Sequence, residues 1–332
     1  MLHKGTAMWI AAIRMLALAA VLAAPTARAL ADDYPSHSIA LVVPFAAGGP
    51  TDTLGRILAE RMSRTLGHTV LVENVTGAGG TIANSKVIKA APDGYTAIIG
   101  HLGTHVLAPA VQGLTTDYLK DFDPVAVVAT NPEVILSRND VPAKNLQELV
   151  AWVKANPGKV TYASGGAGTP SHIMAADFSQ KIAPLNIVHY RGAAPAMQDV
   201  VAGHVDISFD QAATGLNFAR SGKVRAYAVT SATRVPSAPD IPTVDEAGLP
   251  GFYMSVWHGI WVPRGTPPEI VAKLSAAVRE ALLDPEVRKR FADLGQEIPP
   301  PEQQTPRGLA ALHKAETEKW VPIIKAANIR AN

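Results

Sequence analysis

The chain has 332 residues, of which 48% are hydrophobic, 17% charged and 6% aromatic, and its formal net charge is +2. This composition is that of a globular protein with room for two domains of roughly 100–200 residues each, and no block of like charges or low-complexity tract interrupts it. Because the sequence has no cysteine, a disulfide framework, a thiolate metal site and a cysteine nucleophile are excluded.

The first 31 residues have the pattern of a secretory signal peptide. Lys4 and Arg14 precede the apolar run MLALAAVLAAP, which is too short to span a bilayer stably, and ARALA supplies small residues at the spacing that a signal peptidase recognises. We therefore expect export to the periplasm, cleavage near Ala31 and a mature chain that begins near Asp32. A retained membrane anchor is the alternative, whereas lipoprotein attachment is excluded because no cysteine follows.

Removal of this segment changes the charge of the protein. Without Lys4, Arg14 and Arg28, 27 basic residues remain beside 28 acidic ones, so the net charge becomes −1. A nucleic-acid partner requires a basic surface, and we therefore expect no nucleic-acid binding.

Strands and helices alternate in the first part of the mature chain. An apolar run over residues 39–45 predicts a buried strand. The next segment has apolar residues at helical spacing and predicts a helix over residues 51–67, with Thr51 or Asp52 as its N-cap and Gly67 at its end. Further strands are predicted over residues 69–75, 95–101 and 126–137, and a helix over residues 81–91.

The second part of the chain continues this alternation. Helices are predicted over residues 145–158, 171–182, 194–203 and 212–222, and strands over residues 159–164, 185–192, 205–210 and 224–230. From Pro263 onward the chain is predicted to be mainly helical. This regular order predicts an α/β fold with a largely parallel, doubly wound sheet in each half.

Glycine-rich turns follow three of the predicted strands, at PFAAGGPTD (44–52), ENVTGAGGT (73–81) and SGGAGTPSH (164–172). In open α/β sheets ligands bind beyond the carboxyl ends of the strands, and backbone N–H groups at helix N-termini attract anions. Three such turns predict a carboxylate or phosphate site that needs no lysine or arginine, although plain loop geometry is the alternative for any single turn. The turns lack the Gly-Lys-Ser/Thr ending of a P-loop, so the ligand should be smaller than a nucleotide.

Several segments together resemble the Bug family of periplasmic solute-binding proteins, which are similar to the substrate-binding component of tripartite tricarboxylate transporters. They are YPSHSIALVVPFAAGGPTDTLGR, VENVTGAGGTIA, APDGYT, YASGGAGTPSH, YRGAAPAMQDVVAGHVDISFD, SGKVRAYAVTSATRVPSAPDIPTVDEAGLPGF and WVPRGTPPEIV. The resemblance extends from about Tyr34 to about Pro299. Within the family, GHLGTH, DQAATG and SVWHGIW most resemble the subgroup that takes aspartate-like or other small dicarboxylates.

The resemblance implies two α/β domains of the type II periplasmic-binding-protein kind, with a hinge and an interdomain cleft that closes on the ligand. The crossing segments are expected near TNPEV and FYMSVWHG, which gives domain 1 residues 32–132 plus 254–332 and domain 2 residues 133–253. A monomer is expected that binds a small carboxylate and interacts with the membrane permease subunits of a tripartite tricarboxylate-type transporter. Neither a cofactor nor a metal is expected.

The resemblance also implies a set of ligand-binding residues. In the family, two glycine-rich loops of the first domain hold a ligand carboxylate, largely through backbone amides and ordered water. Ala46 and Ala47 stand where the family often has proline, and Pro50 stands where a small residue is common. The expected binding residues are Phe45, Ala46, Gly48, Gly49, Thr51, Asp52, Asn74, Gly79, Gly80, Thr81, His101, Ser164, Gly165, Gly168, Thr169 and Asp210.

Other readings of these residues were weighed. His101 and His105 are four residues apart but are expected on a glycine-containing loop without a zincin-type glutamate, which argues against a metal site. Ser164 or Ser171 could pair with His172 as nucleophile and base, but no nucleophile elbow is present, and Ser171 is better suited to a helix cap.

Two residue assignments stay open in the sequence. Trp257 and His258 could form a wall of the hinge or pack in the core. Asp206 and Asp210 share one strand face, and only Asp210 should reach the cleft, where it could pair with a ligand ammonium group or cap the following turn.

Two classes of function remain at this point. The first is a binding protein that delivers a small carboxylated metabolite to a permease or, less often, to a sensor. The second is an exported hydrolase such as an esterase that uses the same cleft. Amide-lined anion sites without an activated nucleophile favour binding over catalysis.

Overall fold

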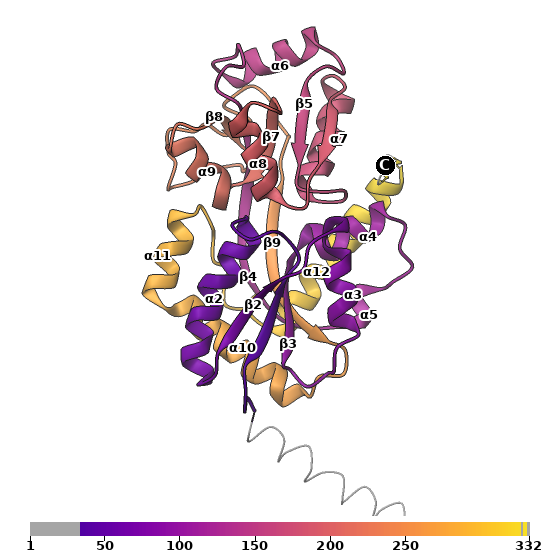
Figure 1. Cartoon of the computed structure of the whole chain (residues 1–332), viewed down its shortest axis with the longest axis vertical. Coiled ribbons are helices and arrows are strands. Elements are labelled where there is room, and N and C mark those ends of the chain that lie inside the picture. Colours follow the sequence, from indigo (N-terminus) through magenta and orange to yellow (C-terminus); the bar gives the residue numbers. More distant parts are fainter. Residues whose placement is uncertain (1–33, 327, 331–332) are drawn as a thin grey trace, which may run out of the picture.

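The eight predicted strands and a ninth that was not predicted, β9 (Ser255–Pro263), form a nine-stranded sheet in the computed structural model, which describes residues 34–326 and 328–330 (Figure 1). The expected signal peptide, residues 1–31, lies outside the described residues. The first elements are β1 (Ile39–Val43), α2 (Pro50–Leu66), β2 (Val70–Asn74), η1 (Ala78–Gly80), α3 (Thr81–Ile88), β3 (Thr96–His101), η2 (Gly103–Leu107), α4 (Ala108–Val111), α5 (Tyr118–Asp121) and β4 (Phe122–Ser137).

The remaining elements complete the second domain and then return to the first. They are α6 (Leu146–Ala155), β5 (Thr161–Ser164), α7 (Pro170–Lys181), β6 (Asn186–His189), α8 (Ala193–Ala202), β7 (Ile207–Gln211), α9 (Ala212–Arg220), β8 (Arg225–Val229), β9 (Ser255–Pro263), α10 (Pro268–Leu283), α11 (Pro285–Asp293) and α12 (Pro306–Ala326).

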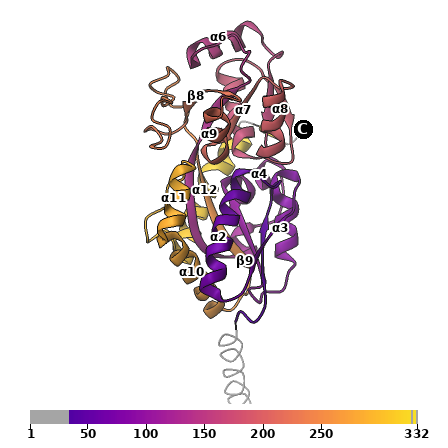
Figure 2. The same ribbon diagram turned by 60° about the vertical axis from the view of Figure 1, so that its left-hand side comes forward.

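The strands divide into two groups that share β4. Domain 1 contains the order β2-β1-β3-β9-β4, with α2, α3, α10, α11 and α12 packed around it, and domain 2 contains β4-β7-β5-β6, with β8 also paired to β4. Figure 2 shows this arrangement from the side, with α6, α7, α8 and α9 at one end of the molecule and α2, α3 and α10 at the other.

β4 changes partners along its length. Its residues from Phe122 to Pro132 pair with β9, and those from Glu133 to Ser137 pair with β7, while β8 pairs with the same end. The 16-residue strand therefore crosses from one domain into the other, and β9 is antiparallel to it.

The α/β class is confirmed, but the prediction of largely parallel sheets was wrong. The β1–β2, β1–β3, β5–β6 and β5–β7 pairs are parallel, whereas the β3–β9, β4–β9, β4–β7 and β4–β8 pairs are antiparallel. The reason is that β4 and β9 pass between the domains in opposite directions and do not belong to a repeating strand–helix–strand crossover.

Helix α2 begins earlier than predicted. Its N-cap is Gly49, and Pro50 occupies the first turn, where its missing N–H and fixed φ suit a helix start. Thr51 and Asp52 therefore lie inside the helix and are not its N-cap. The predicted stop at Gly67 is confirmed, since this residue adopts the left-handed conformation with φ 70°.

Apolar faces of the helices are buried against both faces of the sheet. In domain 1, Leu54 and Leu58 of α2 pack with Ile99 of β3 and with α10 and α11. In domain 2, Tyr162 and Phe209 lie in the cluster with α7. These cores hold the loops at the strand ends in place.

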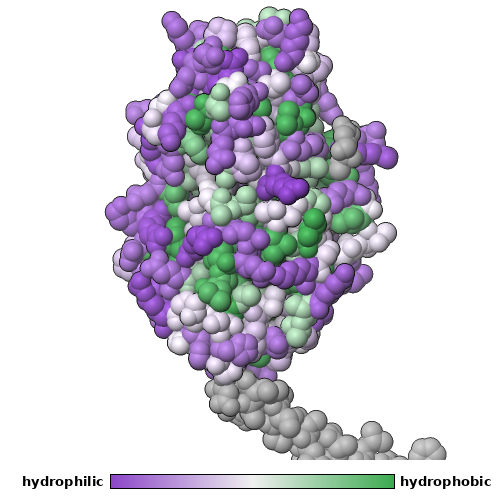
Figure 3. All heavy atoms as spheres, viewed as in Figure 1, coloured by the Kyte–Doolittle hydropathy of each residue, from purple (hydrophilic) through white to green (hydrophobic). Residues whose placement is uncertain are grey.

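The surface shows no continuous apolar band on the face in Figure 3, where apolar side chains are scattered among polar ones. Within the described residues, none of the helices combines the length and the apolar character needed to cross a membrane.

Leu58→Ala should lower the midpoint of urea unfolding, because it leaves a cavity in a fully buried site. Such a truncation should lower the free energy of unfolding by about 2–5 kcal/mol. The control is Leu283→Ala, whose parent side chain is 64% exposed and should tolerate the change. Equal losses for the two variants would show that α2 is not packed as described.

Candidate functional site

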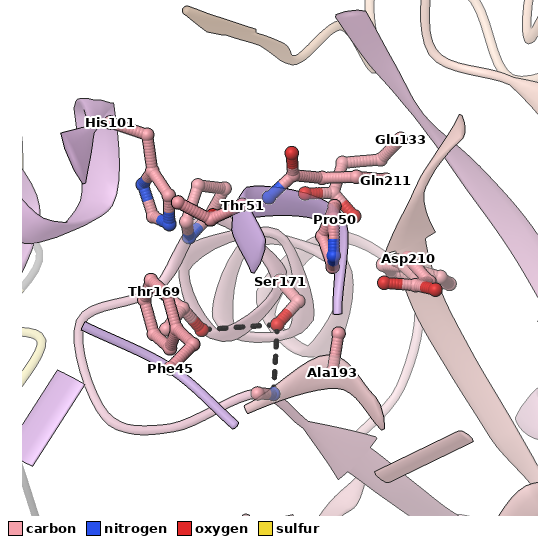
Figure 4. A pocket seen from close by; sticks show the side chains of 13 residues that line it. Phe45, Pro50, Thr51, His101, Glu133, Thr169, Ser171, Ala193, Asp210 and Gln211 are labelled. Atoms are coloured by element: carbon pink, nitrogen blue, oxygen red, sulfur yellow. Dashed lines mark hydrogen bonds between the residues drawn. The ribbon is translucent and has the colours of Figure 1, made fainter. Parts of the chain in front are cut away.

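A pocket lies between the two domains, beyond the carboxyl ends of β1, β3, β5 and β7 (Figure 4). It contains about 350 Å³ of empty space, which includes open solvent. The residues that line it come from both domains and from β4: Phe45, Pro50, Thr51, His101, Glu133, Gly165, Thr169, Pro170, Ser171, Ala193, Phe209, Asp210 and Gln211.

Four helices begin at the wall of this pocket. Pro50 starts α2, Pro170 starts α7 and Ala193 starts α8, while Gln211 immediately precedes α9. The first N–H groups of a helix have no intrahelical acceptor, and the helix dipole adds partial positive charge at the same end. The pocket therefore attracts anions, although no lysine or arginine is among its lining residues.

Asp52 braces the first glycine-rich loop and does not line the pocket. Its carboxylate accepts hydrogen bonds from Gly48 N, Asn74 Nδ2 and Arg56 Nε, each at 2.9 Å. Burial opposes its ionisation, but these hydrogen bonds outweigh burial and hold the pKa of Asp52 below its usual value. Asn74 also donates to Phe45 O at 2.9 Å, so both polar residues fix the loop shape.

His101 offers a neutral donor to the pocket. It is 2% exposed, its ring stacks on Phe45 at 5.0 Å, and burial lowers its pKa to about 3. Gly103 N donates to His101 Nδ1 at 2.8 Å, so the neutral ring carries its proton on Nε2. His101 ends β3 and does not lie on a loop as expected.

The glycine-rich loop of domain 2 is held by its own polar side chains. Thr169 is the N-cap of α7 and donates to Gly166 O at 2.7 Å. The expected cap, Ser171, instead lies inside the helix, where its Oγ accepts from Gly165 N at 3.1 Å and contacts Thr169 Oγ1 at 3.0 Å. The prediction of Ser171 as a cap was wrong because Pro170 starts the helix one residue earlier.

The second glycine-rich loop of domain 1 contacts domain 2. Gly79 has φ 62°, and a Cβ placed on it would lie 2.2 Å from Ala167 O. A Cβ on Gly168 would likewise lie 2.3 Å from Ala108 Cα. The two domains therefore meet through backbone at these glycines, and the cleft is closed.

The structure brings six of the expected binding residues to the pocket: Phe45, Thr51, His101, Gly165, Thr169 and Asp210. The other ten do not line it, and the second glycine-rich turn, residues 73–81, contributes no lining residue: Ala46, Gly48, Gly49, Asp52, Asn74, Gly79, Gly80, Thr81, Ser164 and Gly168. Gly80 packs toward Thr104, and Ser164 is fully buried with its Oγ bonded to Gly166.

Sequence reasoning missed seven lining residues: Pro50, Glu133, Pro170, Ser171, Ala193, Phe209 and Gln211. A signal for Ala193 was present, since the strand–Arg–Gly–helix turn before α8 repeats the pattern of the other turns.

Glu133 and Asp210 place two carboxyl groups in the pocket. They are 1% and 4% exposed, on the paired strands β4 and β7. Burial raises the pKa of Asp210 to about 7, although hydrogen bonds from Thr214 Oγ1 and Gln211 N oppose the rise. Burial, and then the charge of Asp210, raise the pKa of Glu133 well above its usual value.

The structure also shows where Trp257, His258 and His105 lie relative to the pocket. Trp257 packs against Trp261, outside the pocket, and His258 lies below it, with Nε2 3.3 Å from Thr51 Oγ1. His105 lies in η2 and stacks on Trp261 at 3.7 Å. Among the described residues, no group of three or more His, Cys, Asp or Glu side chains is placed to hold a metal ion.

Asp206 lies at the opposite end of its strand from the pocket. Its Oδ1 pairs with Arg138 Nε at 2.9 Å, and its Oδ2 accepts from Thr161 N at 2.8 Å. It therefore has partners of its own, while Asp210 lines the pocket.

The fold and the closed interdomain cleft define a two-domain binding protein of the type II periplasmic kind. The chain belongs to the tripartite tricarboxylate transporter receptor family, whose pattern matches residues 54–329. Members of this family bind small carboxylates and work with transporter components.

Three solved structures are similar to this chain in both sequence and fold. The periplasmic binding protein BugD is 40% identical, with a TM-score of 0.86, over 90% of this chain and 99% of its own. MatC from Rhodopseudomonas palustris, with bound malate, is 42% identical, with a TM-score of 0.84, over 88% and 100%. A second R. palustris protein, with adipate, is 32% identical, with a TM-score of 0.85, over 90% and 99%.

Gly79→Ala should open the cleft, because its new methyl group would overlap Ala167 O of the other domain. Small-angle X-ray scattering should give a larger radius of gyration for this variant than for Gly113→Ala. Gly113 is a matched control, since its φ of 64° carries the same backbone strain and nothing lies within 4 Å of an added Cβ. Equal radii would show that this contact does not hold the domains together.

Proposed function

We propose that the chain is a periplasmic solute-binding protein that captures a small dicarboxylate or acidic amino acid in the interdomain cleft. The observation that carries the proposal is the convergence of the N-termini of α2, α7, α8 and α9 on one closed pocket. Such an array binds a carboxylate through backbone N–H groups. The relatives with bound malate and adipate support a small dicarboxylate as the ligand.

Delivery to membrane permease subunits of a tripartite tricarboxylate-type transporter completes the proposal, in keeping with the family. The signal-like leader supports export to the periplasm. We place the domain boundaries at residues 32–132 plus 254–332 and 133–253, because β4 exchanges β9 for β7 at Pro132 and Glu133. Closure would then bend the chain at β4 and before β9.

Direct contact with the ligand is proposed for four of the expected binding residues, which have polar side chains and line the pocket. These are Thr51 and His101 from domain 1, and Thr169 and Asp210 from domain 2. The remaining residues of the glycine-rich loops would shape the N–H array, as Asp52 does for its own loop.

An exported esterase is the second candidate, but the polar contacts do not favour it. Nucleophilic catalysis requires a serine bonded to a base. Ser171 Oγ bonds to Gly165 N and Thr169, while His172 Nδ1 accepts from Gly168 N at 3.0 Å.

A sensor that passes the closed form to a signalling partner would use the same site and the same ligand.

Succinate should raise the Tm of the purified mature protein, whereas succinamide should not, because only the dianion uses the N–H array. A ligand that binds the folded state alone stabilises it by about 2.7 kcal/mol at a hundred times Kd. Thermal unfolding with matched concentrations of the two compounds makes the comparison. Equal shifts from both compounds would remove the carboxylate from the proposal.

A chromogenic ester separates binding from catalysis in the same preparation. No release of the chromophore above the rate in buffer is expected. Steady turnover that Ser171→Ala abolishes would favour the esterase instead.

A further inference from the structure

The pocket has a wall that conflicts with simple dianion binding. Glu133 and Asp210 are both buried in it, and none of the lining residues is a lysine or an arginine. Two ionised carboxylates facing a dicarboxylate would place four negative charges in a desolvated cleft, where only partial charges oppose them. At least one proton must therefore accompany the ligand, or the ligand must bring a cation.

The partners of the two acids differ. Asp210 accepts hydrogen bonds from Thr214 Oγ1 and from Gln211 N, so its charge is partly satisfied by the start of α9. Glu133 N donates to Thr230 Oγ1, and Glu133 O accepts from Thr230 N, each at 2.9 Å, but the side-chain Oε2 of Glu133 has no hydrogen-bond partner among the described residues. A buried carboxylate oxygen without a donor is costly, whereas a protonated Glu133 needs only an acceptor in the pocket.

The titratable groups around the pocket supply no competing cation. Tyr162 on β5 interacts electrostatically with both acids, and His101 on β3 lines the pocket. His258 on β9 and His172 on α7 contact the lining residues Thr51 and Thr169. Burial lowers the pKa of each of the three histidines. Asp52 and Arg56 on α2 are paired with each other at 2.9 Å. Near neutral pH the Glu133–Asp210 pair is therefore the group in this pocket that can change its charge.

We propose that Glu133 is a neutral carboxylic acid that donates its O–H to an oxygen of the bound ligand, so that the cleft takes up a dicarboxylate together with one proton. The inference rests on the proposed function and narrows its ligand class to plain or hydroxylated dicarboxylates. An amino dicarboxylate would instead pair its ammonium group with an ionised acid of this pair and would need no added proton. Glu133 is then a specificity-determining residue that distinguishes these ligands.

The sign of the pH dependence follows from the pair. Burial raises the pKa of Asp210 to about 7, and burial together with the charge of Asp210 raises the pKa of Glu133 well above its usual value, so the pair holds a proton at low pH and loses it as the pH rises through these raised pKa values. The two groups titrate as a coupled pair, whose proton the ligand requires. The Kd for a dicarboxylate should then rise by about tenfold for each pH unit above the pKa of the pair.

Calorimetric titration of the mature protein with succinate tests this at several values from about pH 6.5 to about pH 8.5, where both succinate carboxyls are ionised. Repeating each titration in phosphate and in Tris, which differ in ionisation enthalpy, counts the protons taken up. We expect uptake that approaches one proton per ligand at the upper end of the range. Glu133→Gln keeps a neutral donor and should bind with no uptake and a flat pH profile, whereas Glu302→Gln, at an exposed position, should behave as wild type.

The wild-type proton count needs no variant, so a misfolded Glu133→Gln protein would leave the test intact. Binding of succinate without proton uptake would overturn the inference, and so would uptake that persists in Glu133→Gln. L-Aspartate that binds at least tenfold more tightly than succinate, without uptake, would show an ionised pair around an ammonium group and would also overturn it. Failure of succinate, malate and adipate alike would overturn the proposed function as well.

Discussion

The passage of β4 through both domains is the constraint on which the rest of the structure depends. Because Phe122–Pro132 pair in one domain and Glu133–Ser137 in the other, the strand ends of both domains point at the same space. The helices that follow those strands must begin there, and their free N–H groups converge on one pocket. Glu133 lies on this same strand and at the wall of that pocket. The strand that connects the domains therefore also carries the residue that we propose selects the ligand.

The electrostatics of the cleft combine opposed contributions. Four helix N-termini attract negative charge without a lysine or arginine in the lining, and the two buried carboxyl groups repel it when they are ionised. A site lined by lysine or arginine would bind anions of many kinds. Here the partial positive charges of the helix N-termini act beside an acid pair, which favours a ligand whose oxygens can accept from the helix N–H groups and from a protonated acid. The neutral His101 adds a directed N–H donor to this balance.

The α/β class and the Gly67 helix stop could be predicted because they depend on local patterns of apolar residues and glycine. The positions of the glycine-rich turns were predicted, but which turns line the pocket and which contact the other domain was not. Whether Gly79 meets a ligand or Ala167 depends on how two domains approach each other, which no local pattern records. Glu133 was missed for the same reason, since its place in the pocket follows from the crossing of β4 between sheets.

In the proposed complex the cleft holds a dicarboxylate between the helix N-termini and a protonated Glu133. A crystal structure of the mature protein grown with L-malate tests this most directly. It should show one malate carboxylate at the N-termini of α2, α7 and α8, and Glu133 within about 3 Å of a ligand oxygen. An empty cleft at saturating malate, or malate bound elsewhere with Glu133 turned away, would contradict the account.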